Sequence, residues 1–253
     1  MERCDFLPVS AEEMHERGWW WYDALVVGGD AYVDHPSFGT AVISRVLEAE
    51  GLRVAVLAQP DWHDAEAFRA MGRPRLGVFI GAGNLDSMVA HYTAAKRRRS
   101  EDFYSPGKRT GCRPDRAAIV YCNRAREAFG PDVPIILGSL EASLRRFAHY
   151  DYWDDSVRRA ILFDAPADLL VYGMGEAATI EIAHRLRKKQ SVHTMTDIPG
   201  TGYITRDPAE CKFEHVTLPS YEDVRDDKRL YAEATRTEYA EHDPVRGRAM
   251  IQP

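Results

Sequence analysis

The stretch "DALVVGGDAYVDHPSFGTAVISRVLEAEGLRVAVLA" (residues 23–58) contains one complete strand–helix–strand unit. Its two ends are short apolar runs rich in β-branched residues, which is typical of strands buried on both faces. Between them, apolar side chains over residues 42–47 recur with helical spacing, and Gly51 follows as a natural helix terminator. Two buried strands joined by a helix predict an α/β fold with a parallel sheet.

The same alternation continues along the chain. Three more strand-like runs begin at Arg75, Pro134 and Ala167, and segments with helical periodicity cover residues 115–130 and 176–189. We therefore predict a doubly wound, mainly parallel, five-stranded Rossmann-like sheet with the strand order 2-1-3-4-5. In that order, the loops after the first and third strands face each other across a crevice, where we expect the function to lie.

The pattern changes after Lys189, so we predict a Rossmann-like domain over residues 1–190 and an extension over residues 191–253. Within the extension, residues 218–241 are predicted to form one exposed, charged helix entered through Pro219 and Ser220. The chain ends without a capping element, which favours a truncated or linking segment.

Composition sets further bounds on the 253-residue chain, which is 45% hydrophobic and has a net charge of -6. This charge argues against general binding to the phosphate backbone of nucleic acids. Lys96–Ser100 nevertheless concentrate four positive charges, which we interpret as a solvated helix end. No stretch is long and apolar enough to span a bilayer, and the amino terminus lacks the order of a secretory signal. These features predict a cytoplasmic protein that does not contact a membrane.

The four cysteines, Cys4, Cys112, Cys122 and Cys211, are widely spaced and form no CxxC pair. This spacing argues against a zinc ribbon, a redox dithiol and a disulfide framework. We predict reduced thiols and no metal site.

The loop after the first strand, residues 28–39, gathers groups that can bind a ligand. Asp30, Tyr32, Asp34 and His35 can hydrogen-bond, and the aspartates and the histidine can also titrate or bind a divalent ion. The alternative is a polar network that braces a tight connection, and the local sequence favours neither interpretation.

Two cofactor motifs are missing from this loop. Its glycines do not have the G-x-G-x-x-G spacing of a dinucleotide site, which argues against NAD. The Asp-x-His-x-x-Gly motif of cobalamin carriers is also absent, since Asp34 is followed directly by His35. Histidine-ligated cobalamin is therefore not favoured.

The loop after the third strand supplies a second set of polar candidates: Asn84, Asp86, Ser87, His91 and Tyr92. If Asn84 caps a helix, Ser87 and His91 lie on one face of it, which we expect to point into the crevice. The alternative is an ordinary capped helix with a partly buried histidine.

The densest polar cluster follows the fourth strand and contains Glu141, Arg145, Arg146, His149 and Tyr150. The i,i+4 spacing predicts an ion pair between Glu141 and Arg145, and the two arginines offer forked donors for a carboxylate or phosphate. A domain interface explains the same composition equally well. After the fifth strand, Glu176 lies at a predicted helix start, from which it could reach a polar group across the sheet.

Taken together, several collinear motifs resemble the amino-terminal region of the YgiQ-type, UPF0313-like radical SAM proteins. The resemblance covers nearly the whole chain and is carried by "GDAYVDHPSFG", "GNLDSMVAHYT", "RPDRAAIVYCNRAREAF", "GSLEASLRRFAHYDYW", "LVYGMGE" and "DIPGTGY". It implies a B12-binding-like fold for this region. It also implies that a later barrel, the partner in cis, holds a [4Fe-4S] cluster through CxxxCxxC and cleaves S-adenosylmethionine.

This sequence contains no CxxxCxxC, so the chain alone is expected to bind neither the cluster nor S-adenosylmethionine and to be catalytically incomplete. We predict an accessory domain that contributes barrel packing or contacts to an unknown small-molecule or macromolecular substrate. One alternative is a module that binds cobalamin without a histidine ligand. Another is a protein or RNA docking module that uses Lys96–Arg99 and the pair Arg145 and Arg146, although the overall charge disfavours nucleic acid.

Overall fold

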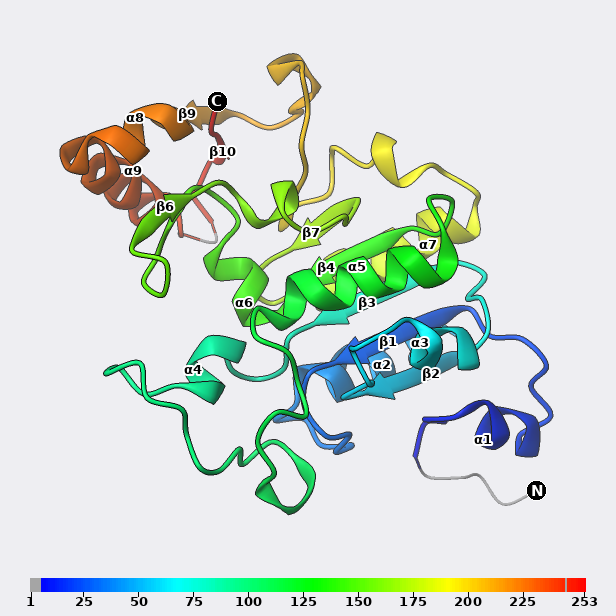
Figure 1. The fold of residues 1–253 in the computed structure, drawn as a ribbon. Coiled ribbons are helices and arrows are strands. Elements are labelled where there is room, and N and C mark those ends of the chain that lie inside the picture. The colour runs from blue at the N-terminus through cyan, green and yellow to red at the C-terminus, as the bar shows by residue number, and fades with distance from the viewer. Residues whose placement is uncertain (1–5, 244) are drawn as a thin grey trace.

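A computed structural model describes residues 6–243 and 245–253, so Cys4 lies outside the described residues. Its centre is a six-stranded sheet in the order β2-β1-β3-β4-β7-β8 (Figure 1). Neighbouring strands are parallel except β8, which pairs antiparallel with β7. The strands are β1 (Ala24–Gly28), β2 (Val54–Ala58), β3 (Gly77–Gly81), β4 (Ile135–Gly138), β7 (Leu169–Val171) and β8 (Thr201–Gly202).

The protein is therefore a mixed α/β fold with a mainly parallel sheet, as predicted. The five predicted strands are present, and their predicted order is that of β2-β1-β3-β4-β7. The predicted count of five is wrong, because β8 adds a sixth strand. It consists only of Thr201 and Gly202, too short to produce a hydrophobic period in the sequence.

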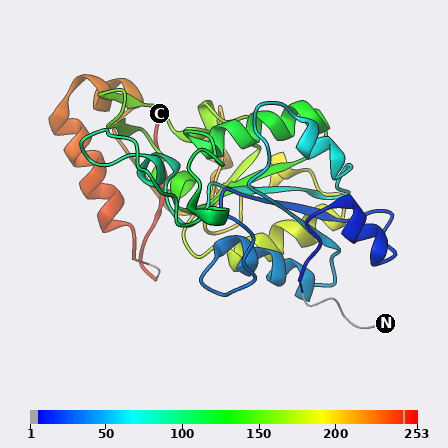
Figure 2. The same ribbon diagram turned by 60° about the horizontal axis from the view of Figure 1, so that its bottom comes forward.

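Helices cover both faces of the sheet (Figure 2). On one face, α2 (Gly39–Ala49) and α7 (Glu176–Arg187) pack on Val26 and Phe79 in one core cluster. On the other face, α3 (Glu66–Ala70) and α5 (Ala117–Phe129) pack on the alternate residues of the same strands. Buried strands with alternating contacts to two helical layers are what the continuous apolar runs predict.

Helix ends follow the sequence in part. The backbone at Gly51 has φ of 78°, the left-handed conformation predicted for the residue that ends α2. In contrast, α4 (Ser87–His91) stops before the basic run, and Tyr92 forms an isolated antiparallel bridge with Arg98. The interpretation of Lys96–Ser100 as a helix end is therefore wrong.

The remaining elements are short. An α-helix, α1 (Ala11–Glu16), precedes the sheet and is capped by Ser10. Another, α6 (Ser139–Leu144), follows β4 directly, and β5 (His149–Asp151) and β6 (Ser156–Arg158) form an antiparallel pair. The 3-10 turns are η1 (Pro106–Lys108), η2 (Ile161–Phe163), η3 (Val192–Thr194) and η4 (Pro208–Glu210).

The carboxyl-terminal segment contains α8 (Tyr221–Asp226), α9 (Lys228–Ala240) and the parallel pair β9 (His215–Thr217) and β10 (Ala249–Ile251). The single helix predicted over residues 218–241 is thus two helices. Asp227 has an extended backbone, with φ of -127° and ψ of 114°, and its side chain caps α9. Ser220 caps α8 through a capping box with Asp223.

The domain division after residue 190 stays a prediction. Among the described residues, we find no helix with the length and apolar character required to cross a lipid bilayer.

Candidate functional site

The strand-end loops meet at the carboxyl edge of the parallel sheet. Asn84 connects two of them, because its amide N–H donates to Asp30 Oδ2 (2.7 Å) and its side-chain Nδ2 donates to the carbonyl of Ser37 (2.9 Å). The amide of Ala82 donates to Ser139 Oγ after β4 (3.0 Å). The loops after β1 and β3 therefore face each other as predicted, and the loop after β4 joins them.

Gly29 permits this close approach. A Cβ atom at residue 29 would lie 2.0 Å from the carbonyl oxygen of Ala82, a distance that no side chain can occupy. The glycine after β1 therefore serves backbone packing between two loops, whereas a phosphate-binding turn would use glycines at other spacings.

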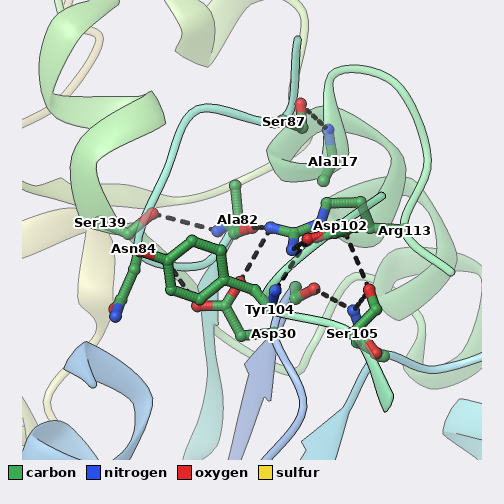
Figure 3. Close-up of polar contacts among 12 residues, drawn as sticks. Asp30, Ala82, Asn84, Ser87, Asp102, Tyr104, Ser105, Arg113, Ala117 and Ser139 are labelled. Atoms are coloured by element: carbon green, nitrogen blue, oxygen red, sulfur yellow. Dashed lines mark hydrogen bonds and ion pairs between the residues drawn. The ribbon is translucent and has the colours of Figure 1, made fainter. Parts of the chain in front are cut away.

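A buried network of two carboxylates and one arginine lies behind these loops (Figure 3). Arg113 donates from Nη1 to Asp30 Oδ1 (2.9 Å) and from Nη2 to Asp102 Oδ1 and Oδ2 (3.1 and 3.0 Å). Their side chains are at most 4% exposed. Burial raises the pKa of Asp30, although the hydrogen bond from Asn84 and the charge of Arg113 oppose this.

The network ties the long connection between α4 and α5 to the sheet. Ser105 Oγ donates to Asp102 Oδ2 (2.9 Å) and accepts from Gln59 Nε2 (2.7 Å), and the amide of Tyr104 donates to Asp102 Oδ1 (3.0 Å). Asp102 and Arg113 were not predicted as site residues from the sequence. They lie in an irregular segment without a period, and the pairing of Asp30 with Arg113 spans 83 positions.

Glu141 caps α5 from a different element. Its carboxylate accepts from the amides of Ser87 (2.9 Å) and Ala118 (3.0 Å), while Ser87 Oγ accepts from the amide of Ala117 (3.0 Å; Figure 3). These acceptors serve the helix start that Arg116, the residue before it, leaves without a side-chain cap. Glu141 is 1% exposed, and burial raises its pKa.

Arg145 does not form the predicted ion pair with Glu141. Its Nη1 pairs with the carboxylate of Asp86 and donates to the main-chain carbonyl of Glu141 (3.1 Å). Asp86 also caps α4 by accepting from the amides of Met88 and Val89, so the expected cap by Asn84 is wrong. The carboxylate of Glu141 is instead satisfied by backbone amides, which leaves Arg145 to Asp86.

A histidine–aspartate pair, in which His91 is buried and Asp115 is exposed, lies at the end of α4. His91 Nδ1 is 2.6 Å from Asp115 Oδ1, and the Tyr92 hydroxyl donates to Asp115 Oδ2 (2.8 Å). Burial raises the pKa of Asp115, but the hydrogen bonds from His91 and Tyr92 outweigh it and lower the pKa below its ordinary value. His91 is 2% exposed, and its Nε2 has no hydrogen-bond partner among the described residues.

The rest of the loop after β1 lies toward α2. Arg45 donates from Nε to Asp34 Oδ2 (3.0 Å), and Tyr32 accepts from the amide of Leu7 through its hydroxyl (3.4 Å). His35 is exposed, and its Nδ1 accepts from the amide of Ser37 (3.1 Å).

Three predicted residues contact other parts of the chain instead of the crevice. Arg146 pairs with Glu238 of α9 (3.4 Å), and the amide of Tyr150 donates to the Tyr231 hydroxyl of the same helix (3.1 Å). His149 has no ion-pair partner among the described residues. Its Nδ1 is 3.2 Å from the carbonyl oxygen of Phe147, and burial lowers the pKa of its imidazole. Arg146 and Tyr150 thus hold the carboxyl-terminal helix.

A cavity of about 320 Å³ opens at the carboxyl edge on the other side of the sheet, between α2 and α7. Its walls are mainly aliphatic and aromatic, and of the residues predicted for the site, Glu176 lines it. The side chains that shape it include Val26, Ile43, Phe79, Ile136, Val171 and Glu176. This is the crevice outside the ends of β1 and β3 where doubly wound sheets bind ligands.

Two of the glycines that line the cavity are not required there by packing or by backbone conformation. A Cβ atom at Gly39 would meet no atom within 4 Å, and one at Gly138 would only reach ordinary contact with the Val171 carbonyl (3.5 Å). Neither residue has a positive φ. Their missing side chains therefore leave the space open. These glycines are the sequence signal for the cavity, which its polar residues do not reveal.

The described cysteines do not fit an iron–sulfur cluster. Cys112, Cys122 and Cys211 are unpaired, and the described part of the chain holds no group of three or more metal-binding side chains. Cys122 is buried in the core, and burial raises the pKa of its thiol, which disfavours the thiolate that iron requires.

Comparisons with known proteins give consistent results for the sequence. A family model described as Radical SAM N-terminal matches residues 6–253. The chain is 52% identical over 252 residues to a UPF0313 protein of Clostridium botulinum (strain 657 / Type Ba4), covering 100% of this chain and 39% of that relative. A UPF0313 protein of Clostridium perfringens (strain SM101 / Type A) is also 52% identical to the chain over 252 residues. The match covers 38% of the length of that relative.

Among solved structures, the chain resembles the radical S-adenosylmethionine methyltransferase TsrM from Kitasatospora setae, solved with cobalamin and a [4Fe-4S] cluster bound. The TM-score is 0.46 at 20% identity, and the likeness covers 72% of this chain and 27% of that one. The chain thus spans about two fifths of the length of the curated relatives it matches.

Proposed function

Because the chain belongs to the Radical SAM N-terminal family, we propose that it is the accessory domain of a radical SAM iron–sulfur enzyme, with its carboxyl-edge loops docked on the catalytic barrel. The barrel would supply the cluster and S-adenosylmethionine, whose reductive cleavage starts the chemistry. This chain would contribute packing and substrate contacts. In this proposal, residues 1–190 form the docking domain and residues 191–253 form the connection.

The observation that carries the proposal is an apolar rim at the carboxyl edge. Each strand-end loop that borders the crevice exposes at least one large apolar side chain, and Met174 and Leu144 are 88% and 60% exposed. The rim consists of Val33 after β1, Val89 after β3, Leu140 and Leu144 after β4, and Met174 after β7. Exposed apolar groups at the ends of several neighbouring strands favour a surface that a partner covers.

The length of the relatives indicates which partner would cover the rim: the rest of the same protein. About three fifths of each curated relative lies outside the region that this chain matches. A domain joined in cis meets this rim at a high effective concentration, so a modest apolar interface is sufficient for docking. The predicted cytoplasmic location is compatible with this arrangement and stays a prediction.

The test uses a hybrid in which this chain replaces the matched region of the C. botulinum relative. Leu144→Glu with Met174→Glu would place two carboxylates in the interface, which costs several kcal/mol when they are left unpaired. We expect small-angle X-ray scattering to show a larger radius of gyration for this variant. A control pair, Tyr239→Glu with Trp20→Glu, alters exposed apolar groups elsewhere and should leave the hybrid compact. Equal radii for both pairs would refute docking at this rim.

A second candidate is a cobalamin module without a histidine ligand, and the cavity between α2 and α7 favours it. The volume, about 320 Å³, suits a flat apolar part of a ligand, while the backbone at Gly39 and Gly138 allows close approach. Because the loop after β1 lacks the Asp-x-His-x-x-Gly spacing, the base-off form without a protein histidine is the one to consider.

Titration with hydroxocobalamin tests this candidate. Binding should change the absorbance spectrum and leave a pink protein after gel filtration, and Gly138→Leu should abolish both by filling the cavity. An unchanged spectrum with the unmodified chain would count against cobalamin, without bearing on docking to the barrel.

A further inference from the structure

The connection between α4 and α5 is a basic arm in an acidic protein. Over residues 92–116 it contains eight lysines and arginines and three aspartates and glutamates, a net charge of +5 in a chain whose net charge is -6. The arm leaves α4, turns outside the sheet and returns to α5 (Figure 1). The positive charge is therefore concentrated on one projecting segment at the carboxyl edge.

The arm is attached to the rest of the protein by buried contacts, so its charges lie on an ordered segment. Asp102 and Arg113 anchor it in the buried network, and the amide of Ala31 donates to the Tyr104 carbonyl (2.8 Å). The exposed cations lie on either side of this anchor. Residues 94–101 and 107–111 are exposed throughout.

An aromatic cluster lies against the basic arm. The rings of Tyr92 and Trp153 are 5.0 Å apart, and those of Tyr152 and Trp153 are 5.4 Å apart. The Tyr152 hydroxyl donates to the carbonyl of Ala94 (2.6 Å), which fixes the cluster to the arm. Tyr152 is 47% exposed and Phe103, further along the arm, is 74% exposed.

The cations and the rings are interleaved. Lys96 Nζ lies 4.8 Å from the centre of the Tyr152 ring, and the Arg98 guanidinium lies 6.0 Å from that of Tyr92. Arg97 and Arg109 show no side-chain partner among the described residues, so their charge is available to a ligand.

We propose that the basic arm and the cluster of Tyr92, Tyr152 and Trp153 bind single-stranded nucleic acid. Arginines and lysines with free charge would contact the phosphates. The exposed ring of Tyr152 and the half-buried rings of Tyr92 and Trp153 would stack on unpaired bases. A double-stranded ligand buries its bases and cannot use the rings, and a simple polyanion has no bases to stack. The local charge outweighs the acidic total, because an exposed charge acts mainly within a Debye length of about 10 Å.

This inference does not depend on the barrel, so its failure leaves the proposed accessory role untouched. The site lies beside the carboxyl edge, where the rim would meet a catalytic domain. Bound nucleic acid would thus lie next to the proposed docking surface.

Fluorescence anisotropy with a labelled twelve-nucleotide oligouridylate and an oligothymidylate of equal length tests the binding. We expect a Kd on the order of 1–100 μM at about 0.1 M salt, and affinity that falls steeply as salt increases. Binding to a blunt duplex should be at least about tenfold weaker. A preference between the two single strands would identify RNA or DNA as the ligand that the site binds better.

Two variants separate charge from stacking. Arg97→Glu with Arg109→Glu should weaken binding by about tenfold or more, while Lys188→Glu with Arg206→Glu makes the same change in net charge elsewhere and should have little effect. Trp153→Ala should weaken binding by about fivefold or more, and Trp20→Ala is its exposed control. Thermal melting checks that each variant is folded.

Three results would overturn the proposal. They are no binding of either single strand, equal losses in the arm and control pairs, or a Trp153→Ala variant that is folded and binds normally. The last result would identify a general polyanion surface.

Discussion

The two sides of the carboxyl edge differ in how their side chains are used. On the α5 side, Asp30, Asp86, Glu141 and Arg145 are engaged with helix ends, loop amides and each other. On the side of α2 and α7, aliphatic walls and glycines leave a cavity of about 320 Å³. The side rich in chemical groups is therefore filled, and the side poor in them is open.

This difference separates two reasons for a polar residue at a strand end. Helix starts and irregular loops carry backbone amides that need acceptors, and buried carboxylates supply them. A ligand needs space first, and space appears where side chains are small. Four predictions test whether each side works as the contrast implies, beginning with the largest effect.

Removing the arginine from the polar side should destabilise the protein most. Arg113→Met leaves Asp30 and Asp102 buried without a cation, which should lower the free energy of unfolding by about 3–5 kcal/mol. Urea unfolding followed by circular dichroism measures the loss. Arg97→Met is the exposed control and should change stability by less than about 0.5 kcal/mol. A similar, small loss in both variants would mean that the network does not hold the arm.

Substitutions of glycine should also affect stability differently on the two sides of the carboxyl edge. Gly29→Ala would place a Cβ atom 2.0 Å from the Ala82 carbonyl, so the two loops must separate. We expect a loss of about 1–3 kcal/mol or more from this overpacking. The thermal midpoint of the variant, compared with that of the parent chain, gives the result. A stable Gly29→Ala variant would show that the loops are not in close contact.

The pH dependence of stability should reveal the burial of Asp30. Its folded pKa is raised above the ordinary value of 3.8, so the native state retains the proton to higher pH than the unfolded chain. The stability contributed by this group is therefore present at low pH and declines as pH rises above about 4.

Asparagine does not titrate, so the stability advantage of the parent chain over Asp30→Asn should shrink as the pH rises above about 4. Urea unfolding of both proteins at several pH values measures this difference. An advantage that grows with pH would indicate that Arg113 outweighs burial and lowers the pKa.

On the cavity side, Gly138→Ala should be nearly neutral. Its Cβ atom would make only an ordinary contact of 3.5 Å with the Val171 carbonyl, and φ at Gly138 is -144°. We expect a change in unfolding free energy below about 1 kcal/mol, in contrast to Gly29→Ala. A large loss would mean that this glycine serves the fold and not an open space.

Much of the fold could be predicted from the sequence because buried parallel strands produce strong local signals. The runs that became β1 to β4 and β7 are continuous and apolar, and the helices between them have clear periods. The strand β8 and the break at Asp227 were missed, since each depends on one or two residues whose conformation is set by tertiary contacts and capping.

The candidate site was harder to predict because its polar residues find partners far along the chain. Asp30 meets Arg113, Asp86 meets Arg145, and Glu141 caps a helix that begins 24 positions before it. Local spacing favoured an ion pair between Glu141 and Arg145, but the Glu141 carboxylate accepts hydrogen bonds from backbone amides instead. The contact of the predicted residues with a ligand stays a prediction.

Hydrogen exchange read by mass spectrometry tests the accessory role most directly, by comparing the 253-residue chain with the hybrid that carries the rest of the C. botulinum relative. Docking at the carboxyl edge predicts slower exchange in the hybrid over residues 30–38, 84–91, 139–145 and 172–176, by about tenfold or more. Loops at the opposite edge, residues 50–53 and 131–134, should exchange at the same rate in both proteins. Unchanged exchange at the carboxyl edge, or protection confined to the opposite edge, would contradict the account.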